Sequence, residues 1–247
     1  MQIAVRDSNE FNSLLHALAD EIVDAKIYFN LHQGLVAAFA EYEVEFGQSW
    51  TFWSLTLRAH TDAVLVRLCK AYDQFDRNNP SLNLGSLLGT IKANMHLFDE
   101  TDFRERLKDN PYVNSLAKTV RRPDAVQLQK DLDSVSKDDP LVKKLTIWRH
   151  NYYAHRSRQH ALDADAFSKQ HPFLSIEEIE ALLKNGVAIM NRYSHLFSAT
   201  LHSTHMIGHD DYLSVLEAVR RDLKAQEAQI QKELAAANAA MRKAADA

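Results

Sequence analysis

The scarcity of residues that break helices is the feature of this sequence that most restricts its fold. Its 247 residues include only 6 glycines and 5 prolines, fewer than a many-stranded sheet with tight turns requires. Apolar residues instead recur at intervals of three and four, the spacing that places them on one side of an α-helix. In the first long segment they are Phe11, Leu14, Leu15, Leu18, Ile22 and Ile27. The sequence therefore predicts an all-α protein.

Local signals indicate where the individual helices begin and end. We expect helices approximately over residues 9–45, 50–75, 84–95, 99–108, 111–135, 140–153 and 175–202, and from 210 or 211 onward. Gly34 marks a candidate bend in the first of them. Asp139 followed by Pro140 is typical of a helix start, because the carboxylate caps free N–H groups and proline suits the first helical position. Ser175 and Glu178 form the pattern of a capping box.

The composition predicts one domain followed by a long helix. The apolar content of 46% is ample for a buried core, and no linker rich in glycine, proline or serine divides the chain. Residues 1–209 are therefore expected to form one helical domain. Residues 210–247 are expected to form a C-terminal helix that packs on the domain or on a partner, with an alanine-rich end that frays.

Charge and cysteine content limit the classes of partner and compartment. The chain has 29 basic and 33 acidic side chains, so nucleic-acid binding would require a local basic patch. Its single cysteine, Cys69, excludes an intrachain disulfide and a cysteine-rich zinc site. In an apolar helical stripe this thiol is expected to be packed and unreactive. Without a signal peptide or a spanning segment, the sequence predicts a cytoplasmic protein with no membrane contact.

The segment WRHNYYAHRS, residues 148–157, does not read as ordinary helix. It lies at the expected C-terminal end of the helix that begins at Pro140. Arg149 and His155 stand six residues apart in it. Histidine titrates near neutral pH and can give or take a proton, whereas arginine stays charged and can bind two phosphate oxygens at once. Packing alone gives no reason for this mixture of side chains.

This segment resembles the signature of the HEPN superfamily, which is an arginine, four to six residues, and a histidine, often with a polar residue directly after the arginine. Here that residue is His150. Two long N-terminal helices, the second containing FWSLTLRAHTDAVLVRLCKAYDQ, and a late helix ending in the motif are similar to those of the abortive-infection AbiU-like branch, over about residues 9–202. The resemblance implies an antiparallel HEPN-like helical bundle, with additional helices and the long C-terminal helix.

The resemblance also implies a function. HEPN proteins of this kind are commonly metal-independent endoribonucleases, toxins or antiphage effectors that act as homodimers, with the two motifs facing each other. The implied substrate is RNA, the implied partners are a second copy and a cognate antitoxin, and no cofactor or metal is expected. Cleavage of RNA through its own 2′-OH requires a base, an acid and positive charge beside the phosphorane.

The resemblance assigns Arg149 to charge stabilisation and His155 to general acid or base catalysis. On an ideal α-helix, at ~100° per residue, six steps leave these two side chains about 120° apart. Two arrangements would bring them together. Either the helix ends near Tyr153 and the chain turns His155 back, or one site mixes residues from two chains.

Other residues of the segment are expected to support this pair. Asn151 and Tyr152 precede His155 by four and three residues, so either could orient its imidazole. Tyr152 and Tyr153 offer rings on which an RNA base can stack. His150, at the polar position of the signature, is expected to tune the site or donate a hydrogen bond.

Three charged residues outside the Arg149–His155 pair complete the expected site. Arg156 and Arg158 would extend positive charge toward flanking phosphates. Asp73, on the second long helix, is a candidate hydrogen-bond partner for Arg149, because the family keeps polar groups there. The structural alternative is that Arg149 is a helix-end arginine favoured by the helix dipole and that the tyrosines are core aromatics.

Two further readings keep the helical fold but change the function. In one, the segment binds RNA, a nucleotide or a protein without cutting. In the other, the protein is a helical adaptor whose C-terminal helix pairs with another chain. A metal site at His202, His205 and His209 is less favoured than a solvated connection. The arginine pairs at 121–122 and 220–221 are interpreted as surface charge.

Overall fold

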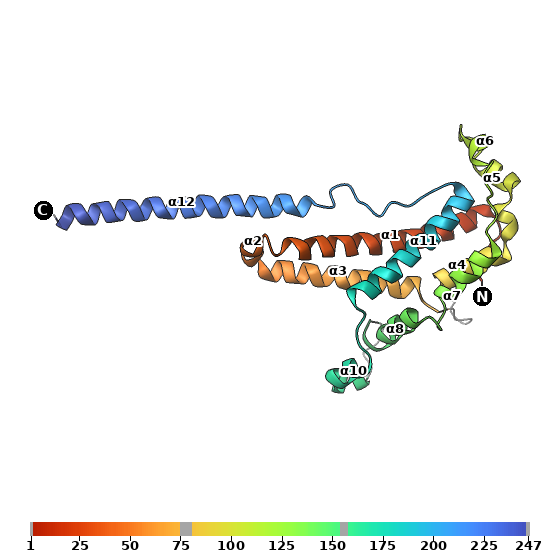
Figure 1. Cartoon of the computed structure of the whole chain (residues 1–247), viewed down its shortest axis with the longest axis horizontal. Helices are drawn as coiled ribbons and strands as arrows, with labels where there is room; N and C mark the ends of the chain where they lie inside the picture. The colour runs from red at the N-terminus through yellow and green to blue at the C-terminus, as the bar shows by residue number, and fades with distance from the viewer. Residues whose placement is uncertain (1, 75–80, 154–157, 246–247) are drawn as a thin grey trace. The chain divides into compact units, whose positions relative to one another are not determined.

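The computed structural model describes residues 2–74, 81–153 and 158–245, the side chains of residues 153, 159 and 160 excepted. These residues form helices and connecting segments without a β-strand, which confirms the predicted all-α class (Figure 1). The chain divides into two compact units. Unit 1 comprises Met1–Phe29 and Thr61–Thr204, and unit 2 comprises Asn30–His60 and His205–Ala247. The boundary expected between residues 209 and 210 stays a prediction.

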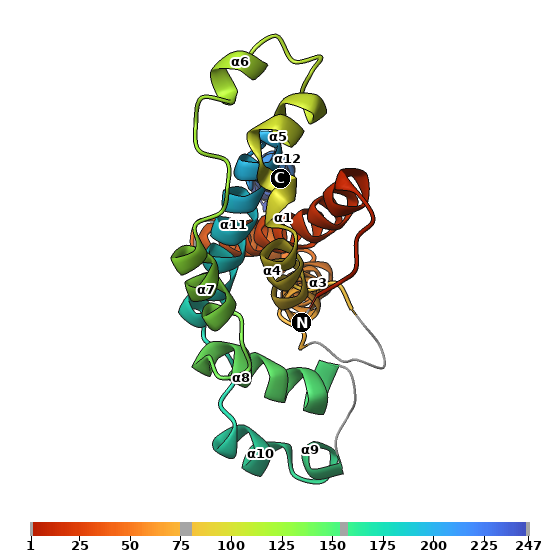
Figure 2. The same cartoon turned by 90° about the vertical axis from the view of Figure 1, so that its right-hand side faces the viewer.

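Two long helices, α1 (Ser8–Ala38) and α3 (Trp50–Ala71), contribute residues to both units. Unit 1 also contains α4 (Leu84–Ala93), the 3₁₀ turn η1 (Met95–Phe98), α5 (Glu100–Arg106), α6 (Val113–Leu116), α7 (Ala125–Ser134), α8 (Pro140–Trp148), the π-helical turn η2 (Arg149–Tyr153), α9 (Arg158–Leu162), α10 (Ala164–Gln170) and α11 (Ile176–Ser198). Within this unit α5 and α6 lie at one end and α8 to α10 at the other (Figures 1 and 2).

Aromatic and charged contacts hold unit 1 together. Phe11 of α1 packs against Phe98 and Phe197, with ring centroids 5.6 and 4.8 Å away, and all three rings are fully buried. Asp131 of α7 is also buried, and its carboxylate accepts hydrogen bonds from Arg192 at 2.5 Å and from the Tyr193 hydroxyl at 2.7 Å. The paired charges join α7 to α11, since an unpaired buried carboxylate would be costly.

The interpretation of Arg121 as surface charge is wrong. Arg121 is only 4% exposed, and its guanidinium donates hydrogen bonds to the carbonyls of Leu116 and His195. It also lies over the Phe103 ring, 4.3 Å from the centroid. Arg121 therefore braces the segment between α6 and α7 against α11.

The single helix predicted over residues 111–135 is also wrong. The structure has two helices there, α6 and α7, with a non-helical segment between Leu116 and Ala125. Pro123 disfavours helical conformation at the residue before it, so no helix continues through residue 122 into α7. The carboxylate of Asp124 then caps α7 by accepting the backbone N–H of Gln127 at 2.7 Å. No helix was predicted over residues 158–170, where α9 and α10 lie. Asp163 caps α10 through the N–H of Ala166.

Unit 2 is formed by the end of α1, α2 (Glu43–Gly47), the start of α3 and α12 (Asp211–Ala245). Its buried core consists of Leu35, Tyr42, Phe46, Trp53 and Leu216. The first helix ends at Ala38 rather than near Glu45, and it does not break at Gly34. A Cβ at Gly34 would lie 2.7 Å from the Tyr212 hydroxyl oxygen. This glycine therefore gives room to a neighbouring ring, not a bend.

Arg220 likewise differs from its interpretation as surface charge. Its Nε lies 2.6 Å from Glu45 Oε1, and another of its nitrogens donates to the Glu41 carbonyl at 2.7 Å. The guanidinium also lies over the Tyr42 ring, 4.1 Å from the centroid. Arg220 therefore joins α12 to α2 within unit 2.

Candidate functional site

The helix that carries the Arg…His motif is anchored at its start. Asp139 Oδ1 accepts the backbone N–H groups of Leu141 and Val142 at 2.9 and 3.0 Å, which confirms the predicted cap and the start at Pro140. Val142, Leu145 and Trp148 are buried at intervals of three residues. This apolar side fixes α8 on unit 1, so its C-terminal end holds the following residues in place.

The α-helical part ends at Trp148, earlier than the predicted Tyr153. Arg149–Tyr153 form a π-helical turn, a local widening of the helix that occurs frequently at functional sites. The Asn151 side-chain amide donates to the Ile147 carbonyl at 2.7 Å. Such a bond competes with the backbone hydrogen bond that an α-helix would make to the same carbonyl, and it gives a physical reason for the change of helix type.

Arg149 is held by two points of contact with Asp73. One terminal nitrogen of Arg149 lies 2.6 Å from Asp73 Oδ1, and the other lies 2.9 Å from Oδ2. The two side chains are 31% and 18% exposed. Asp73 Oδ1 also accepts the backbone N–H of Gln74 at 2.8 Å. The structure thus brings together two residues that are 76 positions apart, and a planar two-point pair fixes the plane of the guanidinium.

The thiol nearest to this pair is not reactive. Cys69 is 5% exposed, and burial raises the pKa of its thiol to about 12, with Arg149 lowering that pKa and Asp73 raising it. A thiol with so high a pKa stays protonated at neutral pH and is a poor nucleophile. Cys69 is therefore a packing residue, as its position in an apolar stripe indicates.

Three other predicted site residues are exposed, two of them in the turn and one at the start of α9. His150 and Arg158 are exposed. Tyr152 is 39% exposed, and its ring meets the Trp148 ring edge to face, with centroids 5.9 Å apart. Tyr152 can therefore offer part of its ring to a ligand while the rest packs on the protein.

Part of the predicted site lies outside the described residues. This holds for His155, Arg156 and the side chain of Tyr153. The convergence of Arg149 and His155, and the orientation of His155 by Asn151 or Tyr152, therefore stay predictions.

An aromatic cluster that was not predicted surrounds Trp148. The Phe173 ring lies 4.5 Å from Trp148 and the Phe167 ring 5.5 Å from it, measured between centroids. The Phe167 ring in turn lies 5.0 Å from the His171 ring. Phe167, His171 and Phe173 come after the motif in the chain, in or beyond α10. Helical spacing within the motif therefore cannot predict that they pack near Trp148. The only sequence sign is the density of aromatic residues in FSKQHPF.

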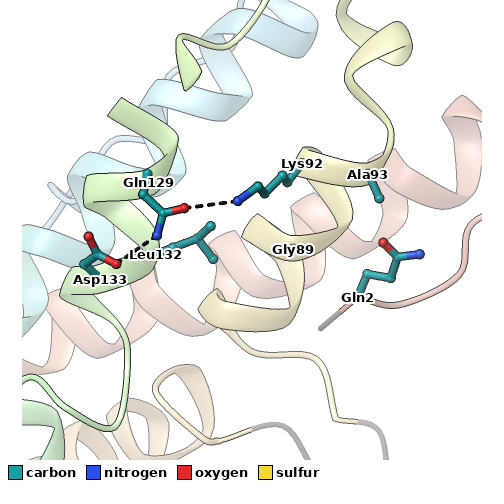
Figure 3. A pocket seen from close by; sticks show the side chains of 7 residues that line it. All are labelled: Gln2, Gly89, Lys92, Ala93, Gln129, Leu132 and Asp133. Carbon is teal, nitrogen blue, oxygen red and sulfur yellow. Dashed lines mark hydrogen bonds between the residues drawn. The ribbon is translucent and has the colours of Figure 1, made fainter. Parts of the chain in front are cut away.

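Two hollows of unit 1 are lined by no described residue of the Arg…His motif. One, of about 340 Å³, adjoins Asp73 and is also lined by Asp138 and Lys137. The other, of about 470 Å³, lies between α4 and α7 (Figure 3). There the Lys92 ammonium donates to Gln129 at 3.0 Å and the Gln129 amide donates to Asp133, so the polar side chains bind one another.

The late histidines have separate surroundings. His202 Nε2 lies 2.9 Å from the Ser194 hydroxyl, and its backbone N–H donates to Asn191 at 2.7 Å. Burial lowers the pKa of His202, and the neighbouring His16 lowers it further. In unit 2 the His205 and His209 ring centroids are 6.3 Å apart. Over the described part of the chain, no group of three or more His, Cys, Asp or Glu side chains is arranged to hold a metal ion.

Comparison with known families places these features in context. A family model described as AbiU2, of the HEPN type, matches residues 8–224, a range that includes both Asp73 and Arg149. The searches of curated proteins and of solved structures find no match. In the described residues, every helix is too short or too polar to cross a membrane. Since the family match covers most of the chain, the chain belongs to the AbiU2 family of HEPN proteins.

Proposed function

We propose that this protein is a metal-independent endoribonuclease that acts in the cytoplasm as a toxin or phage-defence effector. Its HEPN family suggests a role in RNA cleavage or abortive infection. The observation that supports the proposal most is the two-point ion pair between Asp73 and Arg149 at the π-helical turn. It holds a partly exposed guanidinium in one orientation at the end of a firmly capped helix.

The proposed chemistry divides between charge and proton transfer. A guanidinium has five N–H donors, so Arg149 keeps donors for a phosphate while Asp73 binds its two terminal nitrogens. These donors would stabilise the negative charge that develops on the phosphorane. His155 would transfer the proton of the 2′-OH or of the leaving 5′ oxygen. Asp73 acts as a positioning residue, because it orients Arg149 without contacting the substrate.

The proposed active form is a homodimer in which two motifs share a cleft. Cleavage through the 2′-OH needs both a base and an acid, whereas each chain supplies one histidine at the signature position. Two facing motifs would supply both groups. In this proposal a cognate antitoxin keeps the nuclease inactive until the cell is infected.

Substitution of Arg149 or His155 by alanine tests the proposal. We expect purified His155→Ala protein to cleave single-stranded RNA roughly 10²–10⁴-fold more slowly than the parent, the range that acid–base groups typically contribute. Arg149→Ala should slow cleavage roughly 10²–10³-fold, as for loss of a donor to developing negative charge. Cleavage by the parent should persist in EDTA, and both substitutions should abolish toxicity on expression. Arg122→Ala, which removes an exposed arginine outside the site, is the matched control. Undiminished cleavage by both variants, with folding verified by circular dichroism, would refute the assignment.

A binding module that does not cut RNA is the second candidate. The observation that favours it is that both terminal nitrogens of Arg149 already bind Asp73, as they would in a purely structural ion pair. A parent protein that binds single-stranded RNA but leaves it intact, with affinity lowered by Arg149→Ala, would select this candidate.

A further inference from the structure

An apolar slot lies beside the candidate site, between α8 and the segment that follows α10. It has a volume of about 360 Å³ and is lined by Ile147, Trp148, His171 and Pro172, with Lys143 and Lys144 among its lining residues. Its surface is mainly apolar. Pockets that bind small organic groups have volumes of roughly 300–1,000 Å³ and combine apolar walls with a few polar groups, so the slot is large enough for a single aromatic group.

The walls of the slot are fixed by contacts elsewhere. The Trp148 indole N–H donates to the Pro172 carbonyl at 3.1 Å, which ties α8 to the opposite segment. The indole also packs on Phe167 and Phe173, and Trp148 is only 5% exposed. Because these contacts fix the ring, the slot is preformed, and a planar ligand that packs on the more exposed Ile147, His171 and Pro172 would lose little affinity to reorganisation.

The two lysines of the slot differ in their surroundings. Lys144 Nζ lies 2.6 Å from Glu178 Oε2, so its charge is paired. Lys143 is exposed, and among the described residues no hydrogen bond or ion pair engages its ammonium group. The slot therefore combines aromatic and apolar walls with one available positive charge, which is the combination that binds a base together with its phosphate.

We propose that this slot binds one nucleobase of a single-stranded RNA substrate while Lys143 binds the adjoining phosphate. This inference rests on the proposed function. Arg149 directly follows Trp148 in sequence, and its guanidinium lies on Asp73 rather than in the lining of the slot. Because successive helical residues project about 100° apart, the RNA strand would pass around the end of α8 to reach both the slot and Arg149. Paired bases are not free to enter such a slot, so the substrate is unpaired at this point.

Binding of a 2′-O-methyl oligonucleotide tests this inference without cleavage, because that RNA lacks the attacking hydroxyl. Fluorescence anisotropy of a labelled single strand on the full chain gives its Kd. We expect His171→Ala and the slot-filling Ile147→Trp each to raise Kd roughly tenfold, in line with the loss of one base stacked on aromatic groups. Lys143→Gln should weaken binding and reduce the slope of log K against log salt by about 1.

Two control variants and the pattern of Kd values separate the slot inference from the RNase proposal. His96→Ala and Lys118→Gln remove an exposed ring and an exposed charge of unit 1 outside the slot, and they should leave Kd unchanged. Equal Kd values for the parent and the slot variants, at unchanged melting temperatures, would overturn the inference that the slot binds a base. Slot variants that lose binding of a neutralising protein but keep their RNA affinity would overturn it too. The RNase proposal is tested separately, and it fails only if Arg149→Ala and His155→Ala still cleave RNA.

Discussion

Three arginines show that residue type alone does not separate a functional group from a structural one. Arg121 is 4% exposed and its nitrogens are bound to carbonyls, and Arg220 is bound to Glu45 and the Glu41 carbonyl. Arg149 is also paired, but its side chain is 31% exposed at a helix end. A phosphate can therefore reach Arg149, whereas Arg121 has no such access. Exposure thus separates Arg149 from Arg121. Its position in the Arg…His motif separates it from other paired and partly exposed arginines such as Arg192, whose side chain is 34% exposed beside Asp131.

Gly186 provides a stability prediction at the same scale. In the middle of α11, a Cβ at this position would lie 2.9 Å from Cδ1 of the fully buried Ile22. Overpacking costs roughly 1–3 kcal/mol, and the gain from replacing glycine in a helix is roughly 1 kcal/mol. We expect Gly186→Ala to lower the free energy of unfolding in urea by about 1 kcal/mol.

Two companion variants identify the cause. Ile22→Val removes the Cδ1 atom, so adding Gly186→Ala in that background should be neutral or stabilising. At Gly47 an added Cβ meets nothing within 4 Å, and Gly47→Ala should not destabilise the protein. The close-contact explanation would be abandoned if Gly186→Ala cost the same with valine as with isoleucine at position 22.

At the scale of the element, α8 is the part of the fold on which the candidate site depends. Its start is capped by Asp139, its apolar side is buried, and its end changes to a π-helical turn where Asn151 binds the Ile147 carbonyl. The Trp148 wall of the slot and Arg149 lie at the junction of these two helical types. The position of the site therefore depends on how firmly this helix is anchored.

Loss of the α8 cap should destabilise the protein measurably. Asp139→Ala removes the acceptor for the N–H groups of Leu141 and Val142, and N-cap replacements by alanine cost roughly 1 kcal/mol. Asp139→Asn keeps an oxygen acceptor and is expected to retain most of the stability. Urea unfolding followed by circular dichroism compares the three proteins. If alanine and asparagine cost the same, charge rather than capping explains the role of Asp139.

At the scale of the whole molecule, the far part of α12 contributes little to the packed structure. Residues 224–245 are all exposed, and the family match ends at residue 224. Apolar side chains on this part include Ile230, Leu234 and Met241, each more than half exposed. Burial of apolar surface is the main favourable contribution to folding. Residues 224–245 bury no side chain, so this segment adds almost nothing to the stability of the fold.

Truncation after Leu223 separates the nuclease proposal from the adaptor reading. We expect the shortened chain to unfold within about 0.5 kcal/mol of the full chain, as for surface changes, and to keep its RNA cleavage and its oligomeric state. Light scattering coupled to size exclusion measures the latter. Disassembly of the oligomer on truncation, with the fold intact, would support the adaptor.

The class of fold, several helix starts and the main candidate residues could be predicted from the sequence. The starts at Pro140 and after Ser175 were correct because a cap is made by a side chain and backbone groups within three residues of it. The resemblance that named Arg149 also named Asp73 as a candidate partner, and the structure brings the two together. The helix over residues 111–135 was mispredicted although its break has a local cause, Pro123.

By itself, the sequence determined what depends on neighbours along the chain: helical periodicity, capping and the order of residues in the motif. Only the tertiary structure decided which arginine is buried, why Gly34 is small, and that Trp148 and His171 line one slot. These properties arise from contacts between residues far apart in sequence. Helical spacing describes one helix at a time, so it cannot specify which side chains two different elements bring together.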